Sequence, residues 1–113
     1  MKKFELLKII RDGGATLNGD GLPVHFSRGY QVSRRDCFII TVGHVGAILR
    51  AVNALLKGLT AGDFVGVWVD GGRVYIDISE RVERLSDAMR IGIARGQKSI
   101  YDWCLNRCIA LQI

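Results

Sequence analysis

Two carboxylates, Asp77 and Asp102, fall in segments that the sequence predicts to be strands, and both stand beside aromatic residues. Asp is depleted in strands, so each position needs a physical reason. One interpretation is exposure to solvent or pairing with Arg. The other is a ligand-binding cluster on one face, made of Trp68, Tyr75, Asp77, Gln97 and Asp102. Aromatic walls with a few placed polar groups suit a planar, hydrogen-bonding ligand.

A second group of candidate ligand-binding residues lies upstream and consists of Tyr30, Arg34 and Arg35. Arg forks bidentately onto phosphate and carboxylate groups, so the Arg pair beside a tyrosine suits an anionic ligand. A solvated loop is the alternative interpretation of the Arg pair.

The cysteines and histidines offer weaker signals for chemistry. Cys104 and Cys108 are four residues apart, which suits two metal ligands on one helical face. Tetrahedral zinc needs four ligands, and Cys37, His25 and His44 stand at no motif spacing to supply the rest. Nothing around Cys37 and His44 supports a nucleophile and its base. We therefore expect no metal, no cofactor, no catalytic residue and no enzymatic activity.

A β-hairpin must position the aromatic and carboxylate residues. Residues 64–69 and 73–79 are strand-like and flank Gly71-Gly72, which favours a tight turn. With these glycines as the loop, paired residue numbers sum to 143. One face is then aliphatic and must be core. The other face places Trp68 opposite Tyr75 and Gly66 opposite Asp77, leaving open space beside the carboxylate.

The remaining elements follow from periodicity and turn signals. Helices are predicted over residues 3–12 and 44–58, and a third begins after Ser86 as N-cap and closes at Arg95 and Gly96. Strands are predicted over residues 15–17, 30–33, 37–42 (buried), 99–104 and 108–111. This order predicts an α+β fold, with an antiparallel or mixed sheet and a central hairpin packed against two to three helices.

Composition bounds the class of protein. The chain has 113 residues, 49% hydrophobic content and a formal net charge of +5. We expect one domain over residues 1–113, because one core forms at this length. No apolar run is long enough for a membrane span and the first residues do not form a signal peptide, so we expect a cytoplasmic protein. Three cysteines imply no disulfide framework.

The apolar C-terminal residues 108–113 have no charged tail to solvate them. They either join the sheet or pack against a partner chain. We expect a homodimer or another homo-oligomer.

Three segments carry a resemblance: Gly66-Val67-Trp68-Val69-Asp70, Tyr75-Ile76-Asp77-Ile78-Ser79 and Gln97-Lys98-Ser99-Ile100-Tyr101-Asp102. The chain resembles a group of small, largely uncharacterised proteins encoded by phages, prophages and mobile elements. The resemblance implies an accessory role, such as binding and disabling a host factor, and it assigns no catalytic residue.

We therefore expect a binding protein that inhibits a bacterial defence component in the host cell. Two mechanisms are open: sequestering an anionic nucleotide between aromatic side chains and Arg, or docking on a defence protein through the basic surface of this chain. The alternative is a small basic nucleic-acid-binding module, whose affinity would fall steeply with salt. The basic residues are scattered along the chain rather than gathered in one stripe, which favours the first function.

Overall fold

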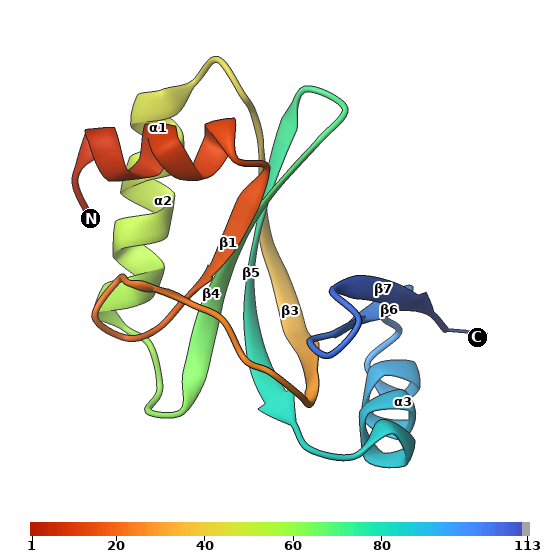
Figure 1. The fold of residues 1–113 in the computed structure, drawn as a ribbon. Coiled ribbons are helices and arrows are strands. Elements are labelled where there is room, and N and C mark those ends of the chain that lie inside the picture. Colours follow the sequence, from red (N-terminus) through yellow and green to blue (C-terminus); the bar gives the residue numbers. More distant parts are fainter. Residues whose placement is uncertain (112–113) are drawn as a thin grey trace.

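The computed structural model describes residues 1–111, which form three helices and seven strands (Figure 1). The elements in chain order are α1 (Lys3–Arg11), β1 (Gly14–Leu17), β2 (Pro23–Val24), β3 (Tyr30–Thr41), α2 (Val45–Lys57), β4 (Asp63–Asp70), β5 (Arg73–Val82), α3 (Leu85–Ala94), β6 (Ser99–Asp102) and β7 (Arg107–Ala110). Within this range, no helix is long and apolar enough to cross a membrane.

The strands form one curled sheet in the order β2-β1-β4-β5-β3-β6-β7, and every neighbouring pair is antiparallel. The predicted α+β class is confirmed. The predicted hairpin register is also confirmed, since Asp70 pairs with Arg73 and Gly66 pairs with Asp77. Both loop glycines have positive φ, of 58° and 79°, as a tight primed turn requires.

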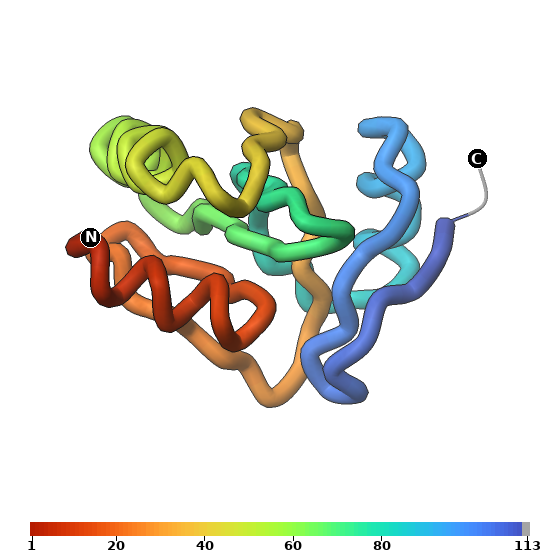
Figure 2. Tube along the Cα trace, turned by 90° about the horizontal axis from the view of Figure 1, so that it is seen from above, coloured from red at the N-terminus to blue at the C-terminus, as the bar shows by residue number. Residues whose placement is uncertain are grey.

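The larger core lies between the sheet and the helices α1 and α2, which cover the same part of the sheet (Figures 1 and 2). Aliphatic side chains that point to this face from the hairpin meet the apolar stripes of both helices. The fully buried residues include Leu6, Leu17, Ile48, Val52, Val65, Val67 and Val74.

A smaller second core holds α3 against β3 and β6, and Figure 2 shows α3, β6 and β7 at the opposite end of the molecule from α1 and α2. Its buried members are Val32, Ala88, Ile100 and Leu111. Gly92 lets α3 approach closely, because a Cβ there would lie 2.6 Å from Leu111 Cδ1. Residues 107–111 thus join the sheet and this core, while residues 112 and 113 lie outside the described part.

Three local predictions are wrong. Ser86 is not the N-cap, because α3 already begins at Leu85 and follows Arg84. Residues 37–42 are largely strand but not a buried one: Phe38 and Ile39 are 42% and 59% exposed. The strand predicted over residues 99–104 ends at Asp102, where a turn begins.

Candidate functional site

A polar row crosses the inner face of the sheet, which we define as the face turned away from α1 and α2. The register places Thr16 of β1 beside Gly66 of β4, and Gly66 beside Asp77 of β5. Within residues 1–111, two buried side-chain oxygens lack a hydrogen-bond partner, Thr16 Oγ1 and Asp77 Oδ1. They flank Gly66, where a Cβ would overlap the Asp77 carboxylate. We call these three residues the polar centre.

The carboxyl of Asp77 is the most perturbed group of the polar centre. Burial raises the pKa of Asp77 to about 6, because the charged form loses its hydration, and the neighbouring Asp36 raises it further. The Ser33 hydroxyl and the Gly66 backbone oppose this shift by hydrogen bonding. A carboxyl that titrates near pH 6 changes its charge within a physiological range.

The indole of Trp68 closes the space that the sequence predicted to be open beside Asp77. A Cβ on Gly66 would lie 2.8 Å from Trp68 Nε1, and one on Gly14 would lie 2.6 Å from Trp68 Cε3. The ring also stacks on Tyr101, with centroids 6.1 Å apart and planes inclined by 28°. Trp68 and Tyr75 are register neighbours as predicted, but Tyr75 is 36% exposed and does not share this packing.

Further aromatic rings extend this packing across the inner face. Edge contacts connect Tyr101 to Trp103, Trp103 to Phe26, and Phe26 to Phe64, with centroids 5.0 to 5.6 Å apart. We call Phe26, Phe64, Trp68, Tyr101 and Trp103 the inner aromatic cluster. It fills the surface on which the sequence predicted a planar ligand to bind.

A buried hydrogen-bond chain supports this cluster, and the sequence analysis missed it. Trp103 Nε1 donates to Gln31 Oε1 at 3.0 Å, and Gln31 Nε2 donates to Ser79 Oγ at 2.9 Å. All three side chains are buried. The available signal was Trp103 itself, because a buried indole N–H usually needs an acceptor.

Three predicted site residues lie away from the polar centre. Tyr30 packs against the second core. Asp102 is 6% exposed, and its Oδ1 accepts hydrogen bonds from the backbone N–H groups of Cys104 and Leu105, so it stabilises the turn after β6. Gln97 lies between α3 and β6. The cluster predicted from Trp68, Asp77, Gln97 and Asp102 is therefore not assembled around one ligand.

The Arg pair is in strand β3, not in the solvated loop weighed as its alternative. Arg34 Nε lies 3.0 Å from Asp63 Oδ2, and Arg34 Nη1 lies 3.1 Å from Glu80 Oε2. Glu80 also forms an ion pair with Arg95. Arg35 is exposed. Of the two predicted anion-binding side chains, Arg34 is thus engaged by carboxylates and Arg35 faces solvent.

The second half of β3 forms an open sheet edge. β6 pairs with β3 at Tyr30 and Gln31 alone. Within residues 1–111, no strand therefore pairs with residues 35–41 along the edge that faces away from β5. We call this stretch the β3 edge. Phe38 and Ile39 lie exposed on it, and Ile39 is the register neighbour of the exposed Tyr75. Two β-bulges interrupt the pairing with β5, one between Ser33 and Arg35 at the start of the β3 edge and one between Asp36 and Phe38 within it.

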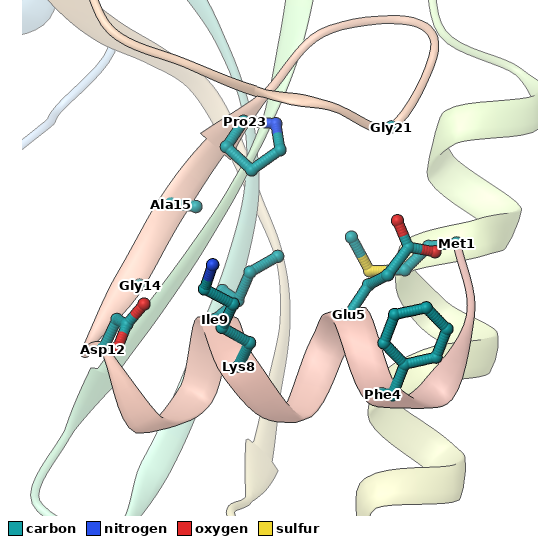
Figure 3. Close-up of a pocket in the computed structure, with 10 residues that line it drawn as sticks. All are labelled: Met1, Phe4, Glu5, Lys8, Ile9, Asp12, Gly14, Ala15, Gly21 and Pro23. Atoms are coloured by element: carbon teal, nitrogen blue, oxygen red, sulfur yellow. The ribbon is translucent and has the colours of Figure 1, made fainter.

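A cleft of about 470 Å³ lies between α1 and the strands β1 and β2 (Figure 3). Its floor is apolar or backbone, from Ile9, Ala15 and Pro23. Three charged side chains on one side of the helix point toward the strands. They belong to Glu5 and Lys8 of α1 and to Asp12, the residue that follows α1.

The cysteines are dispersed. Cys37 is half-buried, and burial raises the pKa of its thiol although the Arg35 guanidinium opposes the shift. Cys104 is exposed in the β6–β7 turn, and Cys108 is exposed in β7. Among residues 1–111, no group of three or more His, Cys, Asp or Glu side chains is placed to hold a metal ion.

Comparisons with protein families, with curated proteins and with solved structures find no match to this chain. The site must therefore be interpreted from its geometry. The inner face is packed with its own side chains, whereas the β3 edge is not covered by a strand and the cleft beside α1 is open.

Proposed function

We propose that the chain is an accessory protein of a phage or mobile element that inhibits a bacterial defence protein by docking on it through the β3 edge. The observation that carries the proposal is the exposed, apolar and uncovered strand segment around Phe38 and Ile39. An open edge accepts an extended strand from another protein, which forms main-chain hydrogen bonds with it.

The backbone geometry of the β3 edge suits such pairing. Val42 N–H donates to Gly72 O, and the register with β5 is unbroken from Phe38 to Thr41. Hydrogen-bonded pairs alternate along an antiparallel ladder, so Phe38 and Ile40 turn their backbone groups toward β5. Ile39 and Thr41 turn theirs outward. The edge therefore offers donors and acceptors at the spacing of a strand.

The exposed side chains indicate what the incoming strand carries. Ile39 and Tyr75 lie on one face and Phe38 on the other, so a strand with apolar side chains on both faces would cover them. The exposed Arg35 and Arg73 stand near the two ends of the segment and favour acidic residues flanking that strand.

Docking on a protein is favoured over nucleotide sequestration because the aromatic side chains of the inner face already pack on one another. A nucleotide base would need a free aromatic ring, yet the Trp68 indole already packs on two glycine backbones and Tyr101. Arg34 is paired with two carboxylates. Of the predicted contacts, Trp68 and Arg34 are therefore not free without rearrangement, and the exposed Tyr75 and Arg35 are left without them.

The test uses bacterial strains that each carry one cloned phage-defence system and express this protein. We expect the wild-type protein to restore plaque formation by a restricted phage in at least one strain. Ile39→Asp places a charge in the apolar contact and is expected to abolish the restoration. It should weaken binding to the identified defence protein by about 30-fold, corresponding to an interface residue worth roughly 2 kcal/mol.

Leu105→Asp is the matched control, because Leu105 is 56% exposed in the turn after β6, a strand that meets β3 at Tyr30 and Gln31, away from Ile39. It should restore plaques as the wild type does. Failure of the wild type in every strain would refute the inhibitory function. Full activity of a folded Ile39→Asp variant would refute the β3 edge as the docking surface.

A further inference from the structure

We propose that the cleft between α1 and β1 binds an extended peptide whose alternate residues are basic, acidic and basic. This site is separate from the β3 edge and does not depend on the inhibitory function. Its components are a charged helix face, an apolar floor, an exposed aromatic rim and the unpaired backbone groups of one strand residue, Gly14.

The charged face has a fixed sign pattern. Glu5, Lys8 and Asp12 follow one another at helical spacing and all point into the cleft (Figure 3). At a rise of about 1.5 Å per residue, they stand roughly 4.5 and 6 Å apart along the helix axis. Side chains on one face of an extended strand repeat every ~6.7 Å. The three helix charges thus span about 10.5 Å and three alternate strand side chains about 13.4 Å. Long, flexible Lys side chains at the two ends of the peptide can bridge this difference, so a basic–acidic–basic series meets each charge of the helix with its opposite.

The Lys8 ammonium group, the central charge of the three, is available for a ligand. Among the described residues no carboxylate forms an ion pair with Lys8. Glu5 uses Oε1 to accept the Lys2 backbone N–H, which leaves its second oxygen available. Asp12 lies 3.6 Å from Arg11, but both side chains are more than half exposed, and such surface pairs are weak.

The strand side of the cleft offers backbone groups. Asn18 N–H donates to Leu22 O, so the alternation along β1 makes Thr16 the next residue bonded to β2 and turns the groups of Gly14 the same way. β2 ends at Val24, and within residues 1–111 it leaves Gly14 unpaired on that side. Gly14 lines the cleft, where an extended peptide would continue the ladder beyond β2.

Apolar contacts complete the site. Ile9, Ala15 and Pro23 line the floor, and the aliphatic stems of the peptide's two basic side chains would pack on them. Phe4 is 69% exposed on the rim beside Glu5, although burying an aromatic ring is favourable. A bound peptide would cover it.

The probe is a fluorescein-labelled, capped pentapeptide KVDVK, with the same residues in the order KKVVD as control, followed by fluorescence anisotropy at low salt. We expect KVDVK to bind the wild-type protein at least about tenfold more tightly than KKVVD. Lys8→Glu makes the helix face wholly acidic and should lose this preference, while gaining affinity for KVKVK.

Two variants control the result. Lys8→Arg keeps the cation and should keep the preference for KVDVK. Lys57→Glu makes the same charge change at the end of α2, outside the cleft, and should leave the preference unchanged. Equal binding of KVDVK and KKVVD by the wild type would overturn the proposal, as would a folded Lys8→Glu variant that still prefers KVDVK. Neither result depends on the phage assay.

Discussion

The two faces of the β4–β5 hairpin are buried by different means. On the outer side, α1 and α2 cover aliphatic residues such as Val65, Val67 and Val74, which are fully buried and carry no polar side-chain atom. On the inner side, the same strands carry Gly66 and Asp77 beneath a layer of aromatic rings. The first face depends on apolar area, which tolerates changes of shape. The second depends on the fit of a few polar atoms, which does not.

The largest effect is expected from Gly66→Ala. The added Cβ overlaps the Asp77 carboxylate and lies 2.8 Å from Trp68 Nε1, so the strand or the ring must move. We expect a loss of about 3 kcal/mol in the free energy of unfolding, at the upper end of overpacking effects. Urea denaturation followed by circular dichroism measures it.

Gly46→Ala is the matched control for this substitution. Gly46 lies in the first turn of α2, and a Cβ there meets nothing closer than the flexible Arg50 side chain at 3.5 Å. Because Ala favours helix more than Gly, this variant should gain roughly 0.5–1 kcal/mol. Equal stability of the two variants would contradict the tight fit at Gly66.

A smaller effect of opposite sign is expected from Asp77→Asn. The folded-state pKa of about 6 lies above the ordinary 3.8, so the wild type loses stability as pH rises from about 4 to 6. The amide cannot ionise, and the variant should be more stable than the wild type by roughly 2–3 kcal/mol at pH 7.

The pH dependence distinguishes an effect of the Asp77 charge from an effect of altered side-chain packing. The difference between the wild type and Asp77→Asn should shrink toward zero at pH 4, where the carboxyl is protonated in both folded and unfolded chains. Thermal unfolding across pH 4 to 8 tests this. A difference that stays constant over the range would show that the Asp77 charge is not the cause.

Trp103→Phe should have the smallest effect of the three. The ring keeps most of its contacts in the inner aromatic cluster, but the hydrogen bond to Gln31 is lost and a buried amide oxygen is left without its donor. We expect a loss of about 1–2 kcal/mol. Adding Gln31→Leu to this variant removes the unpaired amide and should recover part of the loss; no recovery would argue against the hydrogen-bond chain.

The two faces also differ in how far the sequence predicts them. The Gly71-Gly72 loop determined the register, and alternation then identified the aliphatic core correctly. The closure of the inner face depends on Tyr101 stacking on Trp68, a contact between segments far apart in the chain. No local pattern encodes the curl of the sheet that joins them. For the same reason, Asp102 could not be recognised from the sequence as a turn-stabilising residue.

The burial of Leu111 has a consequence for the order in which the protein folds during its synthesis. The larger core draws its fully buried residues from Leu6 to Ile76, so all of them have been synthesised once β5 is complete. The second core joins Val32 to Leu111 and must wait for the C-terminal strand. A chain that stops before β7 would therefore hold every fully buried residue of the larger core, while α3 would have only part of its packing surface.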